Sequence, residues 1–351
     1  MSRRAIGYSG LTGLALALFA FGSALLVGGQ ASAPRIAFVI GTGPTGGTYF
    51  PVGEAIATII SHPPGICRCE KRGVCGPSGL IASVRTSAGS TANVLAVNSH
   101  TVDAALAQSD VVADAIAGRG SFRGAGKQTH VRVLAALFPE EVHLVAAKSA
   151  RVKSVTDLHG KRVSIGARDS GTIVTARAVL AAFRVPQRRI RETNDPSDVA
   201  ADKVLKGQLD AMFFVGGAPV PLVRELLAQG KGVLVPVDGE GRTRLLKQSH
   251  DLTTATLPAG LYPITGKVQT VGVRALFIVN DAVPADVVYA VAKSLFNAAN
   301  HDALAGSHRS AQAIRLDTAA ANLPAPLHAG AERFYREAGK LPKQTQKLGK
   351  T

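Results

Sequence analysis

The sequence predicts an α/β protein with two lobes, and three observations indicate this class. Short apolar runs alternate with segments of helical spacing along most of the 351 residues. A small polar loop separates each of the first three runs from the segment that follows it. The same order of strand, loop and helix begins again after Lys148. Such alternation gives a parallel sheet with helices on its faces, and its loops gather along the carboxyl edge, where ligands bind.

The first lobe begins with three units of strand, loop and helix. We expect the strands at 35–40, 80–86 and 104–106 and the helices at 52–61, 91–98 and 110–117. Ser90 and Ser109 stand directly before the second and third helix, where N-cap residues are preferred. Residues 62–79 are rich in Pro, Gly and Cys, which is typical of a surface loop.

The second lobe repeats this order between two crossings of the chain. Two apolar runs, 131–137 and 142–147, precede it and are separated by Phe138-Pro139-Glu140-Glu141. Within it we expect helices at 152–158, 173–183, 194–206 and 219–229, and strands at 162–165, 211–215 and 233–236. A β-rich run at 270–279 carries the chain back, before helices at 284–300 and 326–338. The predicted lobes are therefore 34–147 plus 271–351 and 148–270, with crossings near 138–148 and 269–279.

The N-terminus predicts export. Arg3 and Arg4 precede an apolar stretch at 11–27, and Ala31-Ser32-Ala33 is a small-residue cleavage site. We therefore assign residues 1–33 to a signal peptide and expect the rest of the chain in the periplasm. An uncleaved anchor is the alternative, because the apolar stretch is nearly long enough to span a bilayer.

Composition excludes some classes of function. Apolar residues make up 46% of the chain and charged residues 18%, as in a globular protein with a core. The formal charge is +16, but the basic residues are scattered and Trp is absent. Basic residues without interleaved aromatic side chains do not form a stacking surface for nucleic acid, so we expect no nucleic-acid partner.

Three cysteines, Cys67, Cys69 and Cys75, lie close together. In an exported protein a disulfide is the expected use of such a cluster. A zinc site would need a fourth ligand, and His62 has no partner at a usual spacing. We favour a bond between Cys69 and Cys75 with Cys67 free, although three cysteines leave other pairings open.

The glycine-rich loop after the first strand indicates an anion site. Residues 40–51 contain Gly41, Gly43, Gly46 and Gly47, and a helix is expected to begin near Phe50 or Pro51. Glycines let a ligand approach the backbone, and the free N–H groups of a helix N-terminus favour an anion. The loop also fits the dinucleotide pattern G-x-G-x-x-G, but the next strand ends without the acidic residue that binds the ribose.

Other catalytic patterns are missing, so we expect neither an enzyme nor a cofactor. The segment 168–172 is not G-x-S-x-G, and the histidines have no metal-ligand spacing. What recurs in both lobes is a set of hydroxyl and amide side chains near helix N-termini. Together they predict a polar cleft for carboxylates without a formal cation: Thr45, Thr48, Tyr49, Ser87, Ser90, Gln108, Ser109, Ser170 and Thr172.

An ordered set of motifs resembles one family of exported proteins. The motifs are T-G-G-T-Y, T-S-A-G-S-T-A-N, A-L-A-Q-S-D, L-F-P-E-E-V-H-L-V, V-T-D-L-H-G-K-R-V-S-I-G, D-S-G-T, G-Q-L-D-A-M-F-F-V and P-L-H-A-G-A-E-R-F-Y-R-E. In this order they resemble the TAXI-type solute receptors of TRAP transporters. The resemblance covers residues from about Ile36 to Gly339.

The resemblance implies a two-lobed periplasmic-binding-protein fold of the two-crossover type, with a ligand cleft between the lobes. The ligand would be a small carboxylate, such as a glutamate-like amino acid or a dicarboxylate. A monomeric receptor would deliver it to the subunits of a TRAP membrane permease. An exported enzyme or a sensory module on the same scaffold is the alternative.

The ligand contacts carried over from the family lie on both lobes. Those of the first lobe are Thr45, Gly46, Gly47, Thr48, Tyr49, Ser90, Gln108 and Ser109. Those of the second lobe are Ser170, Gly171, Thr172, Phe214, Val215 and Gly216. Arg168 and Asp169 depart from the family pattern G-A-P-G-S-G-T, and they either alter ligand choice or face solvent.

Overall fold

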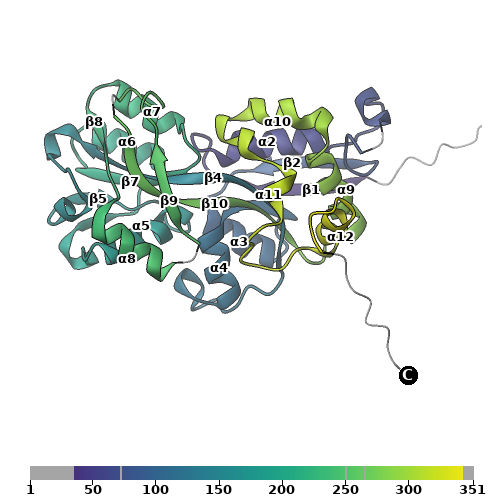
Figure 1. Cartoon of the computed structure of the whole chain (residues 1–351), viewed down its shortest axis with the longest axis horizontal. Helices are drawn as coiled ribbons and strands as arrows, with labels where there is room; N and C mark the ends of the chain where they lie inside the picture. Colours follow the sequence, from purple (N-terminus) through teal and green to yellow (C-terminus); the bar gives the residue numbers. More distant parts are fainter. Residues whose placement is uncertain (1–34, 72, 250, 265, 343–351) are drawn as a thin grey trace, which may run out of the picture. The chain divides into compact units, whose positions relative to one another are not determined.

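The computed structural model describes residues 35–71, 73–249, 251–264 and 266–342 (Figure 1). The predicted signal peptide lies outside these residues. The chain from Arg35 onward is one compact unit. Its described residues contain one mixed sheet with the strand order β2-β1-β3-β10-β4-β7-β5-β6, while β8 pairs with β4 and β9 with β10.

One end of the sheet is parallel, as predicted for the first lobe. It consists of β1 (Ile36–Gly41), β2 (Leu80–Arg85) and β3 (Ala104–Gln108). Helices α2 (Tyr49–Ile60), α3 (Ser90–Asn98) and α4 (Ser109–Ala117) each begin shortly after one of these strands. The loops between strand and helix therefore lie together at the carboxyl edge.

Two long antiparallel strands run through the middle of the sheet (Figure 1). They are β4 (Val131–Ala147) and β10 (Val268–Asn280). The prediction of two separate runs within β4 was wrong, because the strand continues through residues 138–141. Pro139 is exposed and pairs with Arg274 next to a register shift, a place where a strand tolerates the missing N–H of proline.

The other end of the sheet holds the strands predicted at 162–165, 211–215 and 233–236, together with two strands that were not predicted, Arg191–Thr193 and Thr253–Leu257. They are β5 (Arg162–Ser164), β6 (Arg191–Thr193), β7 (Ala211–Gly216), β8 (Gly232–Val235) and β9 (Thr253–Leu257). The helices are α5 (Gly171–Ala182), α6 (Ser197–Leu205), α7 (Pro221–Ala228) and α8 (Gly239–Gln248). The helix predicted at 152–158 is only a 3₁₀ turn at Val155–Leu158, held by a capping box between Ser154 and Asp157.

The C-terminal helices pack against the first end of the sheet. They are α9 (Ala285–Leu295), α10 (His301–Ser307), α11 (Leu316–Ala319) and α12 (Ala329–Glu337). In α12 the fully buried Tyr335 donates a 3.0 Å hydrogen bond to the carbonyl oxygen of Leu134 in β4. Six further 3₁₀ turns lie at Cys67–Glu70, Gly120–Phe122, Lys148–Ala150, Gln187–Arg189, Ala298–Asn300 and Arg309–Ala313.

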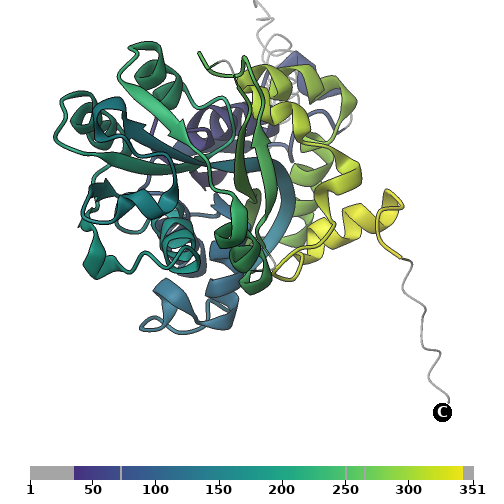
Figure 2. The same cartoon turned by 60° about the vertical axis from the view of Figure 1, so that its left-hand side comes forward.

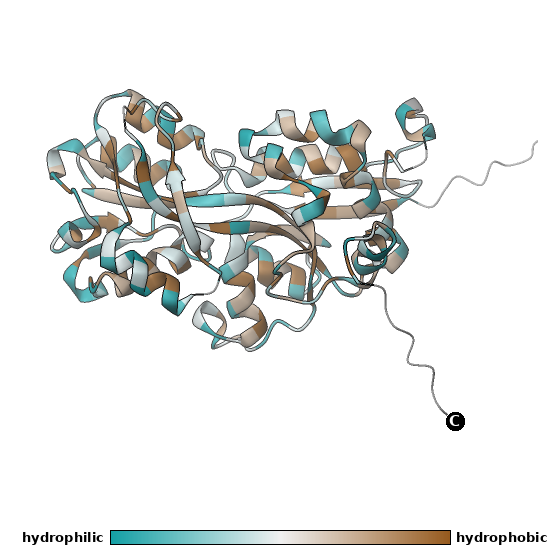
Figure 3. Ribbon diagram, viewed as in Figure 1, coloured by the Kyte–Doolittle hydropathy of each residue, from teal (hydrophilic) through white to brown (hydrophobic). Residues whose placement is uncertain are grey.

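Helices cover both faces of the sheet, and the buried core follows that arrangement (Figure 2). Two hydrophobic clusters flank the end with β1 to β3, and two others flank the end with β5 to β8. Within β4, Leu144 and Ala146 join one of the latter clusters, and Val145 joins the other. In Figure 3 the helices carry both hydrophobic and hydrophilic stretches, as expected for helices with one face on a sheet.

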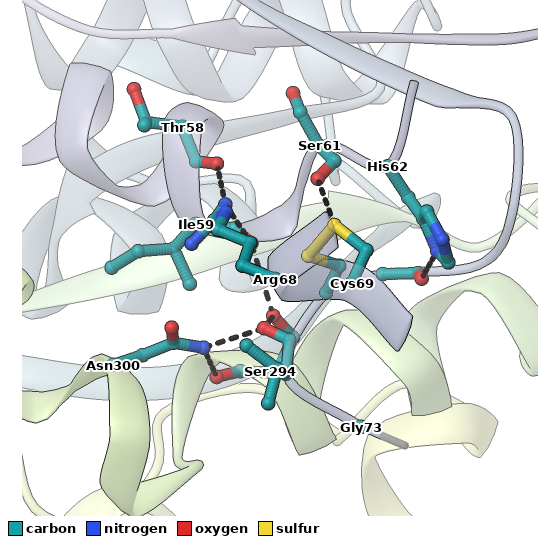
Figure 4. Close-up of a disulfide and its surroundings, with 12 residues drawn as sticks. Thr58, Ile59, Ser61, His62, Arg68, Cys69, Gly73, Ser294 and Asn300 are labelled. Carbon is teal, nitrogen blue, oxygen red and sulfur yellow. Dashed lines mark hydrogen bonds between the residues drawn. A yellow bond between two sulfur atoms is a disulfide. The ribbon is translucent and has the colours of Figure 1, made fainter. Parts of the chain in front are cut away.

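The predicted disulfide between Cys69 and Cys75 is confirmed (Figure 4). The turn that it closes is bound to the C-terminal helices. Ser294 and Asn300 donate hydrogen bonds of 2.8 and 2.6 Å to the carbonyl oxygen of Val74. Arg68 donates to the carbonyl oxygens of Thr58 and Ile59 at the end of α2. The insert at 62–79 is therefore fixed on its own lobe.

None of the helices in the described part of the chain has both the length and the apolar character needed to cross a membrane.

Candidate ligand-binding site

A pocket of about 610 Å³, its open mouth included, lies at the carboxyl edge where loops from both ends of the sheet meet. Its lining is Gly43, Pro44, Gly47, Thr48, Tyr49, Ala88, Gly89, Ser90, Gln108, Glu140, Ser164, Gly166, Ala167, Ser170, Gly171, Thr172, Asp195, Ser197, Ala200, Phe213, Phe214 and Val215.

Five helices present their N-termini to this pocket. The N-cap residues of α2, α3, α4 and α5 belong to the lining, as does the first residue of α6. Each helix N-terminus carries free N–H groups and a partial positive charge. Among the described residues, no Lys, Arg or His lines the pocket. The positive partial charges at the pocket therefore come from backbone groups.

Most of the predicted contact residues come together in this lining. They are Gly47, Thr48, Tyr49, Ser90, Gln108, Ser170, Gly171, Thr172, Phe214 and Val215. The other four, Thr45, Gly46, Ser109 and Gly216, are not part of it. Thr45 and Gly46 are exposed at the tip of their loop, and the Ser109 hydroxyl accepts a hydrogen bond from the backbone N–H of Arg274.

The predicted capping roles hold for only one of three serines. Ser170 caps α5, where its Oγ accepts from the N–H of Ile173 at 3.3 Å. The N-cap of α3 is Gly89 instead of Ser90, and its φ of 126° favours glycine. The N-cap of α4 is Gln108 instead of Ser109. Ser90 is instead the first residue of its helix. Its Oγ accepts a 3.1 Å hydrogen bond from the backbone N–H of Gln108.

The two ends of the sheet touch each other beside the pocket. The N–H of Ala92 in α3 donates a 2.9 Å hydrogen bond to the carbonyl oxygen of Asp169. The Gln108 side chain donates to the Thr175 hydroxyl in α5 at 3.2 Å, and that hydroxyl donates to Asp110 at 2.8 Å. These bonds join the loops from the two ends of the sheet beside the pocket.

Gly171 marks the tightest point of this contact. A Cβ added there would lie 1.5 Å from Oε1 of Gln108 and 2.6 Å from Oγ of Ser90. A larger residue fits here only if the Gln108 and Ser90 side chains move or the loops separate. Arg168 and Asp169 are exposed and lie outside the lining, so the structure favours the solvent-facing alternative for both side chains.

One buried acidic group lines the pocket, and two others lie near it. Glu140 is buried in the lining and accepts a 2.7 Å hydrogen bond from the Tyr49 hydroxyl. Burial raises the pKa of the Glu140 carboxyl well above its ordinary value, and the nearby Asp110 and Glu141 add to this. Burial also raises the pKa values of Asp110 and Glu141 to about 7. Burial therefore favours the protonated form of Glu140, against the opposing effect of the hydrogen bond from Tyr49.

Sequence reasoning missed several lining residues, above all Glu140, Ser164, Asp195 and Ser197. Glu140 belongs to the segment that was expected to break β4. Ser164 is the last residue of β5, and residues at the carboxyl ends of parallel strands face the ligand edge. That rule could have identified Ser164. The described residues contain no group of three or more His, Cys, Asp or Glu side chains able to hold a metal ion.

Comparison with solved structures identifies the fold. MatC from Rhodopseudomonas palustris with bound malate is similar over 87% of this chain and 97% of its own, with a TM-score of 0.52 and 13% identity. A structure described as a periplasmic transporter is similar over 90% of this chain and 98% of its own, with a TM-score of 0.51 and 13% identity. The predicted two-lobed α/β fold of periplasmic binding proteins is thereby confirmed.

Comparison with protein families agrees with this fold over most of the chain. The sequence model of the NMT1-like family matches residues 40–339, which include every residue of the pocket lining. The chain belongs to the NMT1-like family.

Proposed function

We propose that this protein is a periplasmic solute receptor that binds a small carboxylate and delivers it to a TRAP-type membrane permease. The observation that carries the proposal is the meeting of five helix N-termini around one pocket that no cationic side chain lines. Such a site binds a carboxylate through backbone N–H groups and helix dipoles. Each helix terminus contributes about 0.3–1 kcal/mol, and several termini act on one anion here.

The raised pKa of Glu140 makes the pocket more compatible with an anionic ligand. An ionised carboxylate in the lining would repel the ligand, whereas a protonated carboxyl group has an O–H to donate. The second acid of the lining, Asp195, is paired with Lys203 and also accepts from the Thr193 hydroxyl. A glutamate-like amino acid or a dicarboxylate therefore fits the charges of the pocket.

The contacts with the ligand come from both lobes. Those of the first lobe are Gly47, Thr48, Tyr49, Ser90 and Gln108. Those of the second lobe are Ser170, Gly171 and Thr172, with Phe214 and Val215 as an apolar wall. Thr45, Gly46, Ser109 and Gly216 shape and support these loops.

Binding works by closure of the lobes, and it needs no covalent step. A ligand that touches both lobes favours the arrangement in which they meet, so it shifts the population toward the closed form. The motion takes place at the two crossings, near 138–148 in β4 and 269–279 in β10. Without ligand, the hydrogen bonds beside the pocket are the main contacts that hold the loops together, and the open form gains population.

The permease is proposed from the ordered motifs that resemble TAXI-type receptors. Membership in the NMT1-like family and the likeness to a periplasmic transporter support the coarser class of receptor. MatC, which shares the fold, has been described with bound malate, and malate is a dicarboxylate. The predicted signal peptide agrees with a receptor outside the cytoplasm.

Native mass spectrometry of the purified protein tests the ligand class, because a tightly held solute remains bound. A thermal-shift panel of L-glutamate, L-malate, succinate and 2-oxoglutarate extends the test to weaker ligands. We expect at least one carboxylate to raise the melting temperature, and small-angle scattering to show a smaller radius with it. A panel without any shift, together with a co-purified solute that has no carboxylate, would contradict the proposal.

A further inference from the structure

Ser164 has a buried hydroxyl without a partner. Its side chain is fully buried at the end of β5, and its Oγ has no hydrogen-bond partner among the described residues. Buried hydroxyls in folded proteins nearly always have a partner, and an exception calls for an unseen group. Since Ser164 also lines the pocket, that group can be a ligand.

The geometry of β5 places this hydroxyl on the face of the sheet that α6 covers. Val163 and Ile165 lie in the hydrophobic cluster on one face of the sheet. Side chains alternate along a strand, so Ser164 lies on the opposite face. On that side the lining continues with Ser197 and Ala200 of α6.

Other hydroxyls of the pocket are already used within the protein. The Thr48 hydroxyl donates to the carbonyl oxygen of Gly217 at 3.1 Å. The Thr172 hydroxyl accepts from the N–H of Val215 at 3.2 Å, and the Ser170 hydroxyl donates to the carbonyl oxygen of Ala167 at 2.7 Å. Ser164 differs from these three because its hydrogen-bonding capacity is unused.

The N-terminus of α6 offers donors beside this hydroxyl. This nine-residue helix has Pro196 as its N-cap, and no side chain of the described residues caps it. Its first N–H groups are therefore unpaired within the helix. The nearby carboxylate of Asp195 is bound to Lys203 and Thr193, so its charge is offset.

We propose that Ser164 and the N-terminus of α6 form a second polar subsite, which binds an oxygen of the ligand other than its first carboxylate. The Ser164 hydroxyl donates one hydrogen bond to that oxygen, and the N–H groups of Ser197 and Asp198 lie at the same end of the pocket. The inference rests on the proposed function and makes it more specific. The receptor selects carboxylates that carry a second oxygen-bearing group, because the Ser164 hydroxyl hydrogen-bonds that group.

The test compares wild-type protein with Ser164→Ala by isothermal titration calorimetry, using L-glutamate, L-malate and succinate as probes. We expect Ser164→Ala to weaken the binding of the accepted probe about 3- to 30-fold, the range for loss of one hydrogen bond to a neutral or charged oxygen. Its melting temperature without ligand should not fall, because no protein group loses a partner. Ser164→Cys keeps the volume with a weaker donor and should give an intermediate affinity.

Ser294→Ala is the matched control. Ser294 is also fully buried, but its hydroxyl donates hydrogen bonds to the carbonyl oxygens of Ile59 and Val74. None of these three residues lines the pocket. This variant should melt at a lower temperature and bind the probe as wild type does.

The outcomes separate this inference from the proposed function. If the wild-type protein binds a probe and Ser164→Ala binds it with an affinity within twofold of wild type, the subsite is overturned and the receptor function stands. Water alone would then be the partner of the Ser164 hydroxyl. Binding of no probe by the wild-type protein, together with a co-purified solute that has no carboxylate, would overturn both.

Discussion

The Tyr49 hydroxyl donates a 2.7 Å hydrogen bond to Oε2 of Glu140, and this bond joins the first turn of α2 to the middle of β4. Both side chains are buried and line the pocket. The bond therefore connects the ligand site directly to one of the two strands that cross between the lobes. A change in the ionisation of Glu140 would act on the pocket and on the crossing strand together.

Ligand affinity should fall as the pH rises through the raised pKa of Glu140. Burial favours the protonated form of this carboxyl group, and its ionisation would place a negative charge beside a carboxylate ligand. Glu140→Gln keeps an acceptor for Tyr49 but cannot ionise, so its affinity should depend less on pH. Calorimetric titrations of both proteins from acidic to alkaline pH measure the difference. Parallel pH profiles would show that Glu140 does not control binding.

Stability should decrease between about pH 4.5 and pH 7, in part because of Glu141. Burial raises its pKa from 4.5 to about 7 in the folded protein, so the folded state binds the proton more tightly than the unfolded chain. This contribution is complete below the unfolded pKa and is lost as the pH rises through 7. This pKa shift lowers the free energy of unfolding by about 2 kcal/mol across that pH range, after allowance for the partial exposure of Glu141.

Glu141→Gln should remove that part of the pH dependence. The amide oxygen can still accept from the N–H of Ala218, which lies 3.0 Å from Glu141. The variant should therefore unfold at a higher denaturant concentration than wild type at alkaline pH and nearly equally at acidic pH. Part of the pH dependence remains, because burial also raises the pKa of Asp110 to about 7 and raises that of Glu140. Equal stabilities at every pH would contradict this role of Glu141.

Gly171→Ala should hold the lobes apart. The added methyl would lie 1.5 Å from Gln108, so either the amide moves or the contact opens. Overpacking of this kind costs about 1–3 kcal/mol, and we expect ligand affinity to fall at least about tenfold. Small-angle scattering with saturating ligand should show less compaction than in wild type.

The control for that experiment is Gly306→Ala in α10, where an added Cβ meets nothing within 4 Å. It should bind and close as wild type does. Full compaction of Gly171→Ala with unchanged affinity would mean that Gln108 moves aside and that the contact does not limit closure.

Loss of the disulfide should lower stability without changing ligand affinity. Cys69 and Cys75 close a short loop, and a bond with this separation stabilises by about 2 kcal/mol in the chain-entropy account. The double variant Cys69→Ser, Cys75→Ser should therefore unfold at lower denaturant concentration. Neither cysteine lines the pocket, so the ligand affinity of the folded variant should equal that of wild type. A lower affinity under conditions where the variant is fully folded would contradict this prediction.

Local patterns predicted the fold well where each signal is contained in a few residues. Strand β1, its glycine loop and helix α2 follow from an apolar run, four glycines and an amphipathic segment. Helix α8 and strand β9 were missed, because their sequences are polar and only two residues of α8 are buried. Their structure depends on packing against distant segments, such as the pairing of β9 with β10.

The site was predictable in part for the same reason. Glycines and hydroxyls beside helix N-termini are visible in the sequence, and most of them line the pocket. Whether a hydroxyl such as that of Thr172 or Ser164 is free for a ligand depends on partners far along the chain. Glu140 was missed because its burial depends on Tyr49, ninety-one positions away.

The pairing of β4 with β10 has a consequence for unfolding. The two crossings are hydrogen-bonded to each other from Asn280 and Val131 at one end to Gly272 and Glu141 at the other. Both also supply residues to the cores of the two lobes. Because neither lobe can melt without disrupting strands that the other lobe needs, the chain should denature as one cooperative unit. A calorimetric scan should therefore show a single heat-absorption peak in place of two.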